Sequence, residues 1–101
     1  GGGEVETESF VRIDGNLHFI QGDDRGENKE GKYLRFALKR EYQDVDGGLR
    51  HDFIILRAYD NTIKDWILSK REGTPVLVEG ELRSSRGSGE VYVYVKEIRE
   101  R

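Results

Sequence analysis

The stretch Arg50–Arg83, "RHDFIILRAYDNTIKDWILSKREGTPVLVEGELR", changes its hydrophobic period twice. Over 50–59, apolar residues alternate with polar ones, which predicts a half-buried β-strand. Over 61–73 they recur at helical intervals, which predicts an amphipathic helix. Alternation returns over 75–83, after a glycine and a proline that forbid further helix. The stretch is therefore predicted to fold as strand, helix and strand.

The ends of this helix have recognisable signals. Asp60 or Asn61 can cap its first turn, because a side-chain oxygen there accepts from a free backbone N–H. We place Lys70 and Arg71 in the last turn, where the helix dipole favours cations. Its apolar face is predicted to consist of Ile63, Trp66 and Ile67.

Three more alternating segments flank this stretch, at 10–20, 32–42 and 90–98. The predicted inward positions of all the strands are Val11, Ile13, Leu17, Phe19, Leu34, Phe36, Leu38, Ile54, Leu56, Ala58, Val76, Val78, Leu82, Val91, Val93 and Val95. Gly15 and Gly80 interrupt two of the strands and predict bends or bulges.

The connections are polar and rich in glycine: "QGDDRGENKEG" at 21–31, "QDVDGG" at 43–48 and "SSRGSG" at 84–89. The first of these is expected to be a mobile loop and the others turns. The resulting order is three strands, a helix and two strands. We therefore predict an all-β protein, a five-stranded Greek-key OB-fold barrel with one α-helix between strands 3 and 4.

Length and composition limit the possible classes of protein. The 101 residues suffice for one domain, which we place at 8–101. Residues 1–7 are expected to be a tag remnant or a flexible terminus, because Gly1-Gly2-Gly3 opens a chain without methionine. The absence of cysteine excludes disulfides and suits a reducing cytoplasm. No segment is apolar enough to span a membrane.

Nothing in the sequence suggests catalysis. It has no plausible nucleophile–base pair and no phosphate-cradling loop. The two histidines, His18 and His51, lie far apart, and without cysteine they make a metal site unexpected. We therefore expect a protein that is not an enzyme and uses neither metal nor cofactor.

Cations and aromatic residues gather on the strand faces opposite the predicted core. They are Arg12, His18, Tyr33, Arg35, Lys39, Phe53, Arg57, Tyr59, Arg83, Tyr92, Tyr94 and Lys96. The acids among them are Asp14, Glu41, Glu79, Glu81 and Glu90. Aromatic rings stack on any base, and Lys and Arg pair with phosphates, so the pattern favours sequence-tolerant binding of single-stranded nucleic acid. A subunit interface and simple strand propensity stay open as alternatives.

Several motifs in order resemble the single-stranded DNA-binding protein (SSB) family of bacteria and their phages and plasmids. They are "GNL" at Gly15–Leu17, "DFIILRAYDNTIKDW" at Asp52–Trp66 and "KREGTPVLVEGELRSS" at Lys70–Ser85. The resemblance implies an OB-fold that binds single-stranded DNA in replication, recombination and repair. It also implies a nucleoid-associated homo-oligomer, a tetramer or dimer, that can meet replication or recombination proteins.

The same resemblance implies that Tyr42, Phe53 and Tyr59 stack bases. Tyr42 lies on the core parity of its strand, so a bulge or the strand end must turn it outward. Together with the face described above, the expected stacking residues are Tyr42, Phe53, Tyr59, Tyr92 and Tyr94. The expected phosphate contacts are Arg12, Arg35, Lys39, Arg57, Arg83 and Lys96.

Two features depart from the SSB pattern. Gly87 stands where the family often has a loop aromatic, so Tyr92 or Tyr94 compensates or that contact is absent. The sequence ends "KEIRER" without the family's acidic-tipped tail, which was removed or is missing in a reduced relative. The primosomal replication protein N family shares the fold and lacks that tail. An accessory acting mainly through protein contacts therefore stays open, as does an OB-fold subunit that binds RNA.

Overall fold

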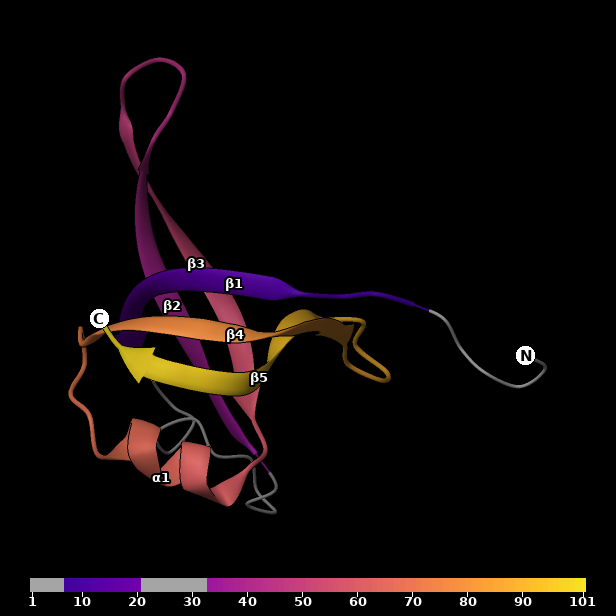
Figure 1. Ribbon diagram of the computed structural model, residues 1–101. Helices are drawn as coiled ribbons and strands as arrows, with labels where there is room; N and C mark the ends of the chain where they lie inside the picture. The colour runs from indigo at the N-terminus through magenta and orange to yellow at the C-terminus, as the bar shows by residue number, and fades with distance from the viewer. Residues whose placement is uncertain (1–6, 21–32) are drawn as a thin grey trace.

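The computed structural model describes residues 7–20 and 33–101. The elements are β1 (Val11–His18), β2 (Leu34–Gln43), β3 (Leu49–Ala58), α1 (Asn61–Leu68), β4 (Pro75–Ser84) and β5 (Val91–Glu100) (Figure 1). The strands close into a barrel in the order β1-β2-β3-β5-β4. All neighbours are antiparallel except β3 and β5, which are parallel. The predicted OB-fold is confirmed, including the position of its helix. The predicted loop at 21–31 and the glycine start lie outside the described residues.

Gly15 marks the point where β1 changes partner. Residues Val11–Asn16 pair with β4, whereas Asn16–His18 pair with β2. A Cβ on Gly15 would lie 3.0 Å from the Leu38 Cβ atom. The missing side chain therefore lets β1 cross closely over β2, as the predicted bend requires.

A bulge at Lys96 shapes the second bend. Glu79 pairs with Glu97 and Gly80 with Val95, which leaves Lys96 without an opposite residue. A Cβ on Gly80 would lie 2.0 Å from the carbonyl oxygen of Tyr94, so only glycine fits there. The extra residue also shifts the parity of β5.

The core confirms most of the predicted inward positions. It consists of Leu17, Leu34, Phe36, Leu38, Leu56, Ala58, Ile67, Val76, Val78, Val93 and Val95, with Val11, Ile13, Phe19, Ile54 and Ile98 packed against it. Leu82 and Val91 were predicted inside, and this was wrong because both are exposed. Val91 is the first residue of β5 after the β4–β5 turn, and Leu82, two residues before the end of β4, lies opposite Val93.

The helix is shorter than predicted. Asp60 caps it by accepting from the backbone N–H of Ile63 at 3.1 Å, as expected. It ends at Leu68, with Ser69 as C-cap, because the Ser69 N–H bonds to both Asp65 and Trp66 and tightens the last turn. Lys70 and Arg71 therefore lie beyond the last turn, and their predicted position was wrong. The predicted apolar face packs on the core. None of the described helical residues forms a segment long and apolar enough to cross a membrane.

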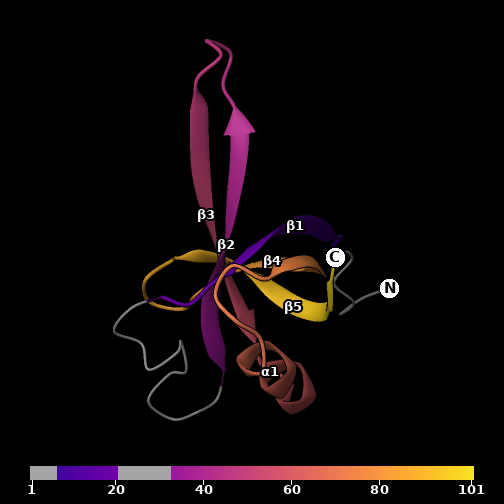
Figure 2. The same cartoon turned by 90° about the vertical axis from the view of Figure 1, so that its left-hand side faces the viewer.

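The β2–β3 hairpin extends well beyond the barrel (Figures 1 and 2). Its register runs without a shift from Leu34 opposite Ala58 to Gln43 opposite Leu49. Gly47, at φ 86°, supports the turn at its tip. Tyr42 is therefore 42% exposed because its strand outruns the core, and not because of a bulge.

Candidate nucleic-acid interface

The outward face of β3 carries a row of chemically distinct side chains. Phe53 and Arg57 lie on this face, and Tyr59, the residue directly after β3, has the same parity. In the strand register, Lys39 of β2 lies opposite Phe53, and Tyr94 of β5 lies opposite Arg57. The sheet thus brings predicted site residues from three strands onto one continuous face.

One end of this face is a cluster of tyrosines. The rings of Tyr59 and Tyr94 are stacked, with centroids 5.3 Å apart and an interplanar angle of 24°. Tyr33 lies on the other side of Tyr59, with centroids 5.1 Å apart. Together with Arg57 and Tyr92, these residues form what we call the tyrosine–arginine cluster. The rings of Tyr33, Tyr59 and Tyr94, of which the last two are stacked and the first is tilted by 36° to Tyr59, provide the π-surface that bases recognise.

Arg57 is held inside the cluster. Its guanidinium carbon lies 4.5 Å from the ring centroid of Tyr33 and 4.1 Å from that of Tyr92. Its Nη1 donates to the hydroxyl of Tyr59 at 3.4 Å. Burial disfavours its charged form, yet this bond and the surrounding phenols raise the pKa of Arg57. Within the described part of the chain its buried Nε has no hydrogen-bond partner.

The parity of β5 predicted that Tyr92 lies on the surface, but the structure buries it. It is only 7% exposed, because the guanidinium of Arg57 covers its ring. Burial raises the pKa of Tyr92, and a hydrogen bond with Tyr59 raises it further. Tyr92 therefore supports Arg57 from below, while Tyr59 and Tyr94 remain half-buried.

Acidic side chains pair with nearly all the predicted phosphate-binding cations. Glu90 contacts Arg35 at 2.9 Å and Arg57 at 3.9 Å. Glu81 contacts Arg83 at 2.9 Å and Lys96 at 2.8 Å. The remaining described pair of this kind joins Arg12 to Glu79 at 3.8 Å. The predicted cations are therefore largely neutralised in the structure.

Phe53 forms a second aromatic position on the same face. It is 52% exposed, and its ring forms an edge-to-face contact with that of His18, with centroids 5.3 Å apart. His18 in turn bonds to Glu72 at 2.8 Å, and Glu72 also accepts from the backbone N–H of Phe19. This chain of contacts orients one side of Phe53.

Tyr42 is separated from these residues. It pairs with Arg50 in the hairpin register, and so belongs to the opposite parity from Phe53. The hairpin thus presents Tyr42 and Phe53 on different faces, and both are exposed. The other aromatic positions predicted from the SSB resemblance, Phe53 and Tyr59, do share a face.

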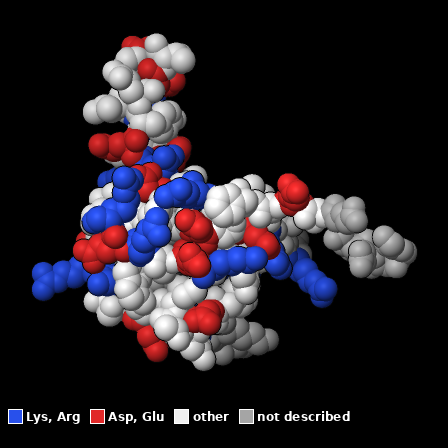
Figure 3. Space-filling view, in the orientation of Figure 1, with Lys and Arg blue, Asp and Glu red and all other residues white. Residues whose placement is uncertain are grey.

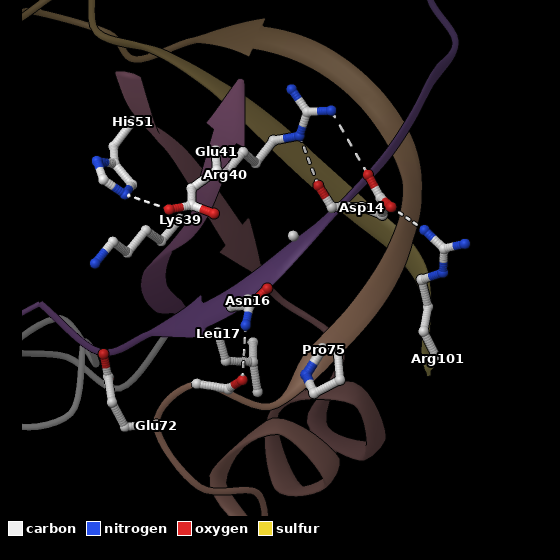
Figure 4. Close-up of a pocket in the computed structure, with 12 residues that line it drawn as sticks. Asp14, Asn16, Leu17, Lys39, Arg40, Glu41, His51, Glu72, Pro75 and Arg101 are labelled. Atoms are coloured by element: carbon white, nitrogen blue, oxygen red, sulfur yellow. Dashed lines mark hydrogen bonds and ion pairs between the residues drawn. The ribbon is translucent and has the colours of Figure 1, made fainter. Parts of the chain in front are cut away.

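A polar groove of about 620 Å³ lies between β1, β2 and the α1–β4 connection (Figure 4). Asp14 lies between Arg40 and Arg101 and pairs with both. Lys39 also lines the groove, and its charge is among the causes that lower the pKa of Glu72. Because Lys39 lies opposite Phe53 on the neighbouring strand, the groove continues the aromatic face toward β1.

Charge is mixed on the face of the molecule that Figure 3 shows. On the side with β1, β4 and β5, Lys and Arg are interleaved with Asp and Glu, and acidic residues mark the hairpin tip (Figure 3). The net charge of −3 is consistent with this mixture. Any attraction for a polyanion is therefore local.

Three residues that the sequence placed on this face were given no role in binding: Tyr33, Glu81 and Glu90. The parity that Tyr33 shares with Arg35 placed it on the face, and the structure adds its contact with Tyr59. Glu81 and Glu90 were noted as acids on the face, without their cation partners. Arg83 is two positions from Glu81 on β4, so strand parity could have indicated that pair. The pairs of Glu81 with Lys96 and of Glu90 with Arg35 join segments far apart in the sequence, and only the tertiary structure reveals them.

Comparison with known structures finds close similarity in fold. A small single-stranded DNA-binding protein from Mycoplasma pneumoniae matches with a TM-score of 0.72 at 12% identity, covering 93% of this chain and 94% of that one. The Streptomyces coelicolor small single-stranded DNA-binding protein matches at 0.65 and 20%, covering 96% and 95%. The Plasmodium falciparum SSB, solved in complex with ssDNA, matches at 0.63 and 17%, covering 97% and 98%.

The chain has the fold of single-stranded DNA-binding proteins. No family model matches the sequence, and no curated protein matches it either. At these identities the similarity shows a shared fold and does not assign a role to any side chain of this protein.

Proposed function

We propose that this protein binds single-stranded DNA with little sequence preference. The observation that carries the proposal is the row of Tyr33, Tyr59 and Tyr94, in contact with one another and beside arginines, on the outer face of an OB-fold sheet. Stacking contributes roughly 1–3 kcal/mol per base and works for every base. The similarity in fold to proteins that bind single-stranded DNA supports the same function.

In this proposal, bases stack on the tyrosine row and the strand then continues to Phe53. Tyr59 and Tyr94 are the main stacking residues, because they are half-exposed and already adopt a stacked geometry. Phe53 offers a further ring beyond them. Tyr42 adds a ring on the other face of the hairpin for a strand that wraps around it. Tyr92, which is buried, holds Arg57 in place rather than stacking a base.

The phosphates are proposed to meet the cations that border this row. Arg35 and Arg57 lie beside the tyrosines, and Lys39 lies beside Phe53. Arg83 lies over the ring of Tyr94, with its guanidinium carbon 4.8 Å from the centroid. The more distant cations, Arg12 and Lys96, extend the path over β1 and β5.

We place this binding activity in DNA replication, recombination and repair, as a non-enzymatic function of a nucleoid-associated protein. Self-association as a dimer or tetramer belongs to the proposal as well. Weak DNA binding would instead favour the alternative function, that of a primosome-like accessory protein that acts mainly through protein contacts.

The test is fluorescence anisotropy of labelled oligo-dT at two salt concentrations, with a duplex of equal length alongside. Tight, salt-sensitive binding of the single strand, with far weaker binding of the duplex, is expected. Tyr59→Ala is expected to weaken binding about tenfold or more, since stacking of one base is lost. Tyr59→Phe keeps the ring but removes the hydroxyl that accepts from Arg57, so it is expected to weaken binding less than Tyr59→Ala does.

A folded wild-type protein that fails to bind oligo-dT at low salt would overturn the proposal. Unchanged affinity of a folded Tyr59→Ala variant would show that the tyrosine row does not contact the DNA. Equal affinity for RNA of the same length would widen the ligand class to single-stranded nucleic acid.

A further inference from the structure

The carboxylate of Glu90 occupies the centre of the cationic part of the site. Its Oε1 accepts from Arg35 Nε at 3.3 Å and its Oε2 from Arg35 Nη2 at 2.9 Å. Oε1 also lies 3.9 Å from Arg57 Nη2. A two-pronged contact of this kind is the geometry with which arginine binds a phosphate as well as a carboxylate. The arginines proposed to bind DNA therefore already hold an anion.

Glu90 is delivered to this position by the β4–β5 turn. Its backbone carbonyl accepts from Ser85 N–H at 2.8 Å, and its own N–H donates to the Ser88 hydroxyl at 3.2 Å. Gly87 and Gly89 have positive φ angles of 87° and 73° within the turn. The backbone of Glu90 is thus anchored at the end of a hairpin, while its side chain reaches across to β2.

The carboxylate is accessible enough to be exchanged. The Glu90 side chain is 33% exposed and that of Arg35 is 27% exposed. The hydrogen bond with Arg35 is the main cause that lowers the pKa of Glu90, so the group is ionised at neutral pH. Glu90 is therefore a charged, partly solvated anion beside the tyrosine row.

We propose that Glu90 takes the place of a nucleic-acid phosphate in the free protein, and that binding exchanges its carboxylate for a backbone phosphate. This inference rests on the proposed function and adds a regulatory element to the same site. Glu90 keeps Arg35 and Arg57 positioned and neutralised without ligand, and it lowers affinity because DNA has to displace it. Glu81 holds Arg83 and Lys96 in a similar way, although with its partners on the edge of the site.

The experiment compares wild type with Glu90→Gln by anisotropy of labelled oligo-dT across a salt series. Glu90→Gln is expected to lower Kd about two- to fivefold, the range given by loss of a partly exposed ion pair. Its salt dependence is expected to be steeper, because salt anions then occupy the arginines and are released when DNA binds. Glu100→Gln is the matched control: it removes the same charge and also breaks an ion pair, with Lys70 at 3.2 Å. Its Kd is expected to stay at the wild-type value.

Equal or weaker binding by a folded Glu90→Gln variant would overturn the exchange, while wild-type binding would still uphold the proposed function. Tightening by Glu100→Gln to the same extent would also overturn it, since the effect would then be general charge. Failure of both wild type and Glu90→Gln to bind would overturn both proposals.

Two further variants keep the test decisive. In an Arg35→Gln background, Glu90→Gln is expected to give a smaller gain, because the two residues act through one contact. If Glu90→Gln does not fold, Glu90→Asp replaces it. Its shorter side chain cannot span both arginines, so tighter binding is again expected, and unchanged or weaker binding would overturn the exchange.

Discussion

At the scale of single residues, the site depends on how each charge is balanced. Arg57 is 9% exposed, and a buried cation is tolerated only with compensating partners. Two ring faces, a phenol hydroxyl and the nearby Glu90 carboxylate provide that compensation. Lysine could not replace it, because an ammonium lacks the planar group that fits between two rings.

Glu72 provides a prediction about acid stability. Burial opposes its charged form, but bonds from Phe19 N–H and His18 lower its pKa below the usual 4.5. A lowered folded-state pKa means that its contribution is complete above that value and is lost as pH falls through the folded pKa. Glu72→Gln is therefore expected to destabilise the fold near neutral pH, by less than about 1 kcal/mol because the pair is half exposed.

The measurement is urea unfolding of wild type and Glu72→Gln from about pH 7 to about pH 3. The gap between the two unfolding free energies is expected to close at the acidic end. A gap that is constant over this range would show that the charge of Glu72 does not stabilise the fold. Glu97→Gln, at an exposed position on β5, controls for the general effect of removing a carboxylate.

At the scale of elements, two hairpins give the barrel its functional shape. The β2–β3 hairpin keeps one register over its whole length and so carries Tyr42 and Phe53 outward on different faces. The β4–β5 hairpin contains the Lys96 bulge, which switches the parity of β5. The bulge allows Val95 and Ile98, an odd number of residues apart, to pack on the same core.

Gly80 is expected to be the most sensitive glycine of the described strands. Gly80→Ala would place a methyl group 2.0 Å from the Tyr94 carbonyl oxygen, a backbone atom that cannot move without opening the bulge. We expect a loss of at least about 1–3 kcal/mol in unfolding free energy, as for other overpacked sites. Thermal or urea unfolding measures the loss.

Gly48→Ala is the matched control for that variant. A Cβ on Gly48 would meet only the exposed carboxylate of Asp46, at 3.1 Å, and this flexible group can move. Its stability is expected to stay within about 0.5 kcal/mol of wild type, as for most surface changes. A Gly80→Ala variant as stable as the control would refute the close approach of β4 and β5.

At the scale of the whole molecule, net charge and local charge have opposite effects on the binding of a polyanion. The net charge is −3, so the molecule as a whole does not attract a polyanion. Local cations on the β2–β3–β5 face and in the groove of Figure 4 have to provide the attraction. Binding is therefore expected to depend on salt through individual contacts rather than through total charge.

Lys39→Ala tests this local electrostatic contribution. Lys39 is exposed beside Phe53 and lines the groove. Its loss is expected to reduce the slope of log affinity against log salt by about 0.7, the value for one phosphate contact on a single strand. Oligo-dT anisotropy at four or more salt concentrations measures the slope.

Lys70→Ala removes the same charge from a position paired with Glu100 and is expected to leave the slope unchanged. Equal slopes for Lys39→Ala and wild type would place Lys39 outside the phosphate path. Equal reductions in both variants would instead mean that total charge sets the salt dependence.

Local sequence pattern by itself determined the elements of this protein. Alternating and helical periods identified the five strands and the helix, because side-chain direction follows backbone period within a segment. Gly15 and Gly80 marked both bends, since each bend needs a position without Cβ. Strand parity predicted most of the core, but it was wrong at Leu82 and Val91, which are exposed, and at Tyr92, which is buried.

The tertiary structure alone decided which charges and rings meet. Arg35 and Glu90 are 55 positions apart in the chain, and Tyr59 meets Tyr94 because β3 and β5 run parallel. Parity cannot show that Arg57 covers Tyr92, because burial depends on the neighbouring strand and not on the strand's own period. Pairing between distant strands sets these contacts, and local sequence contains no measure of that register.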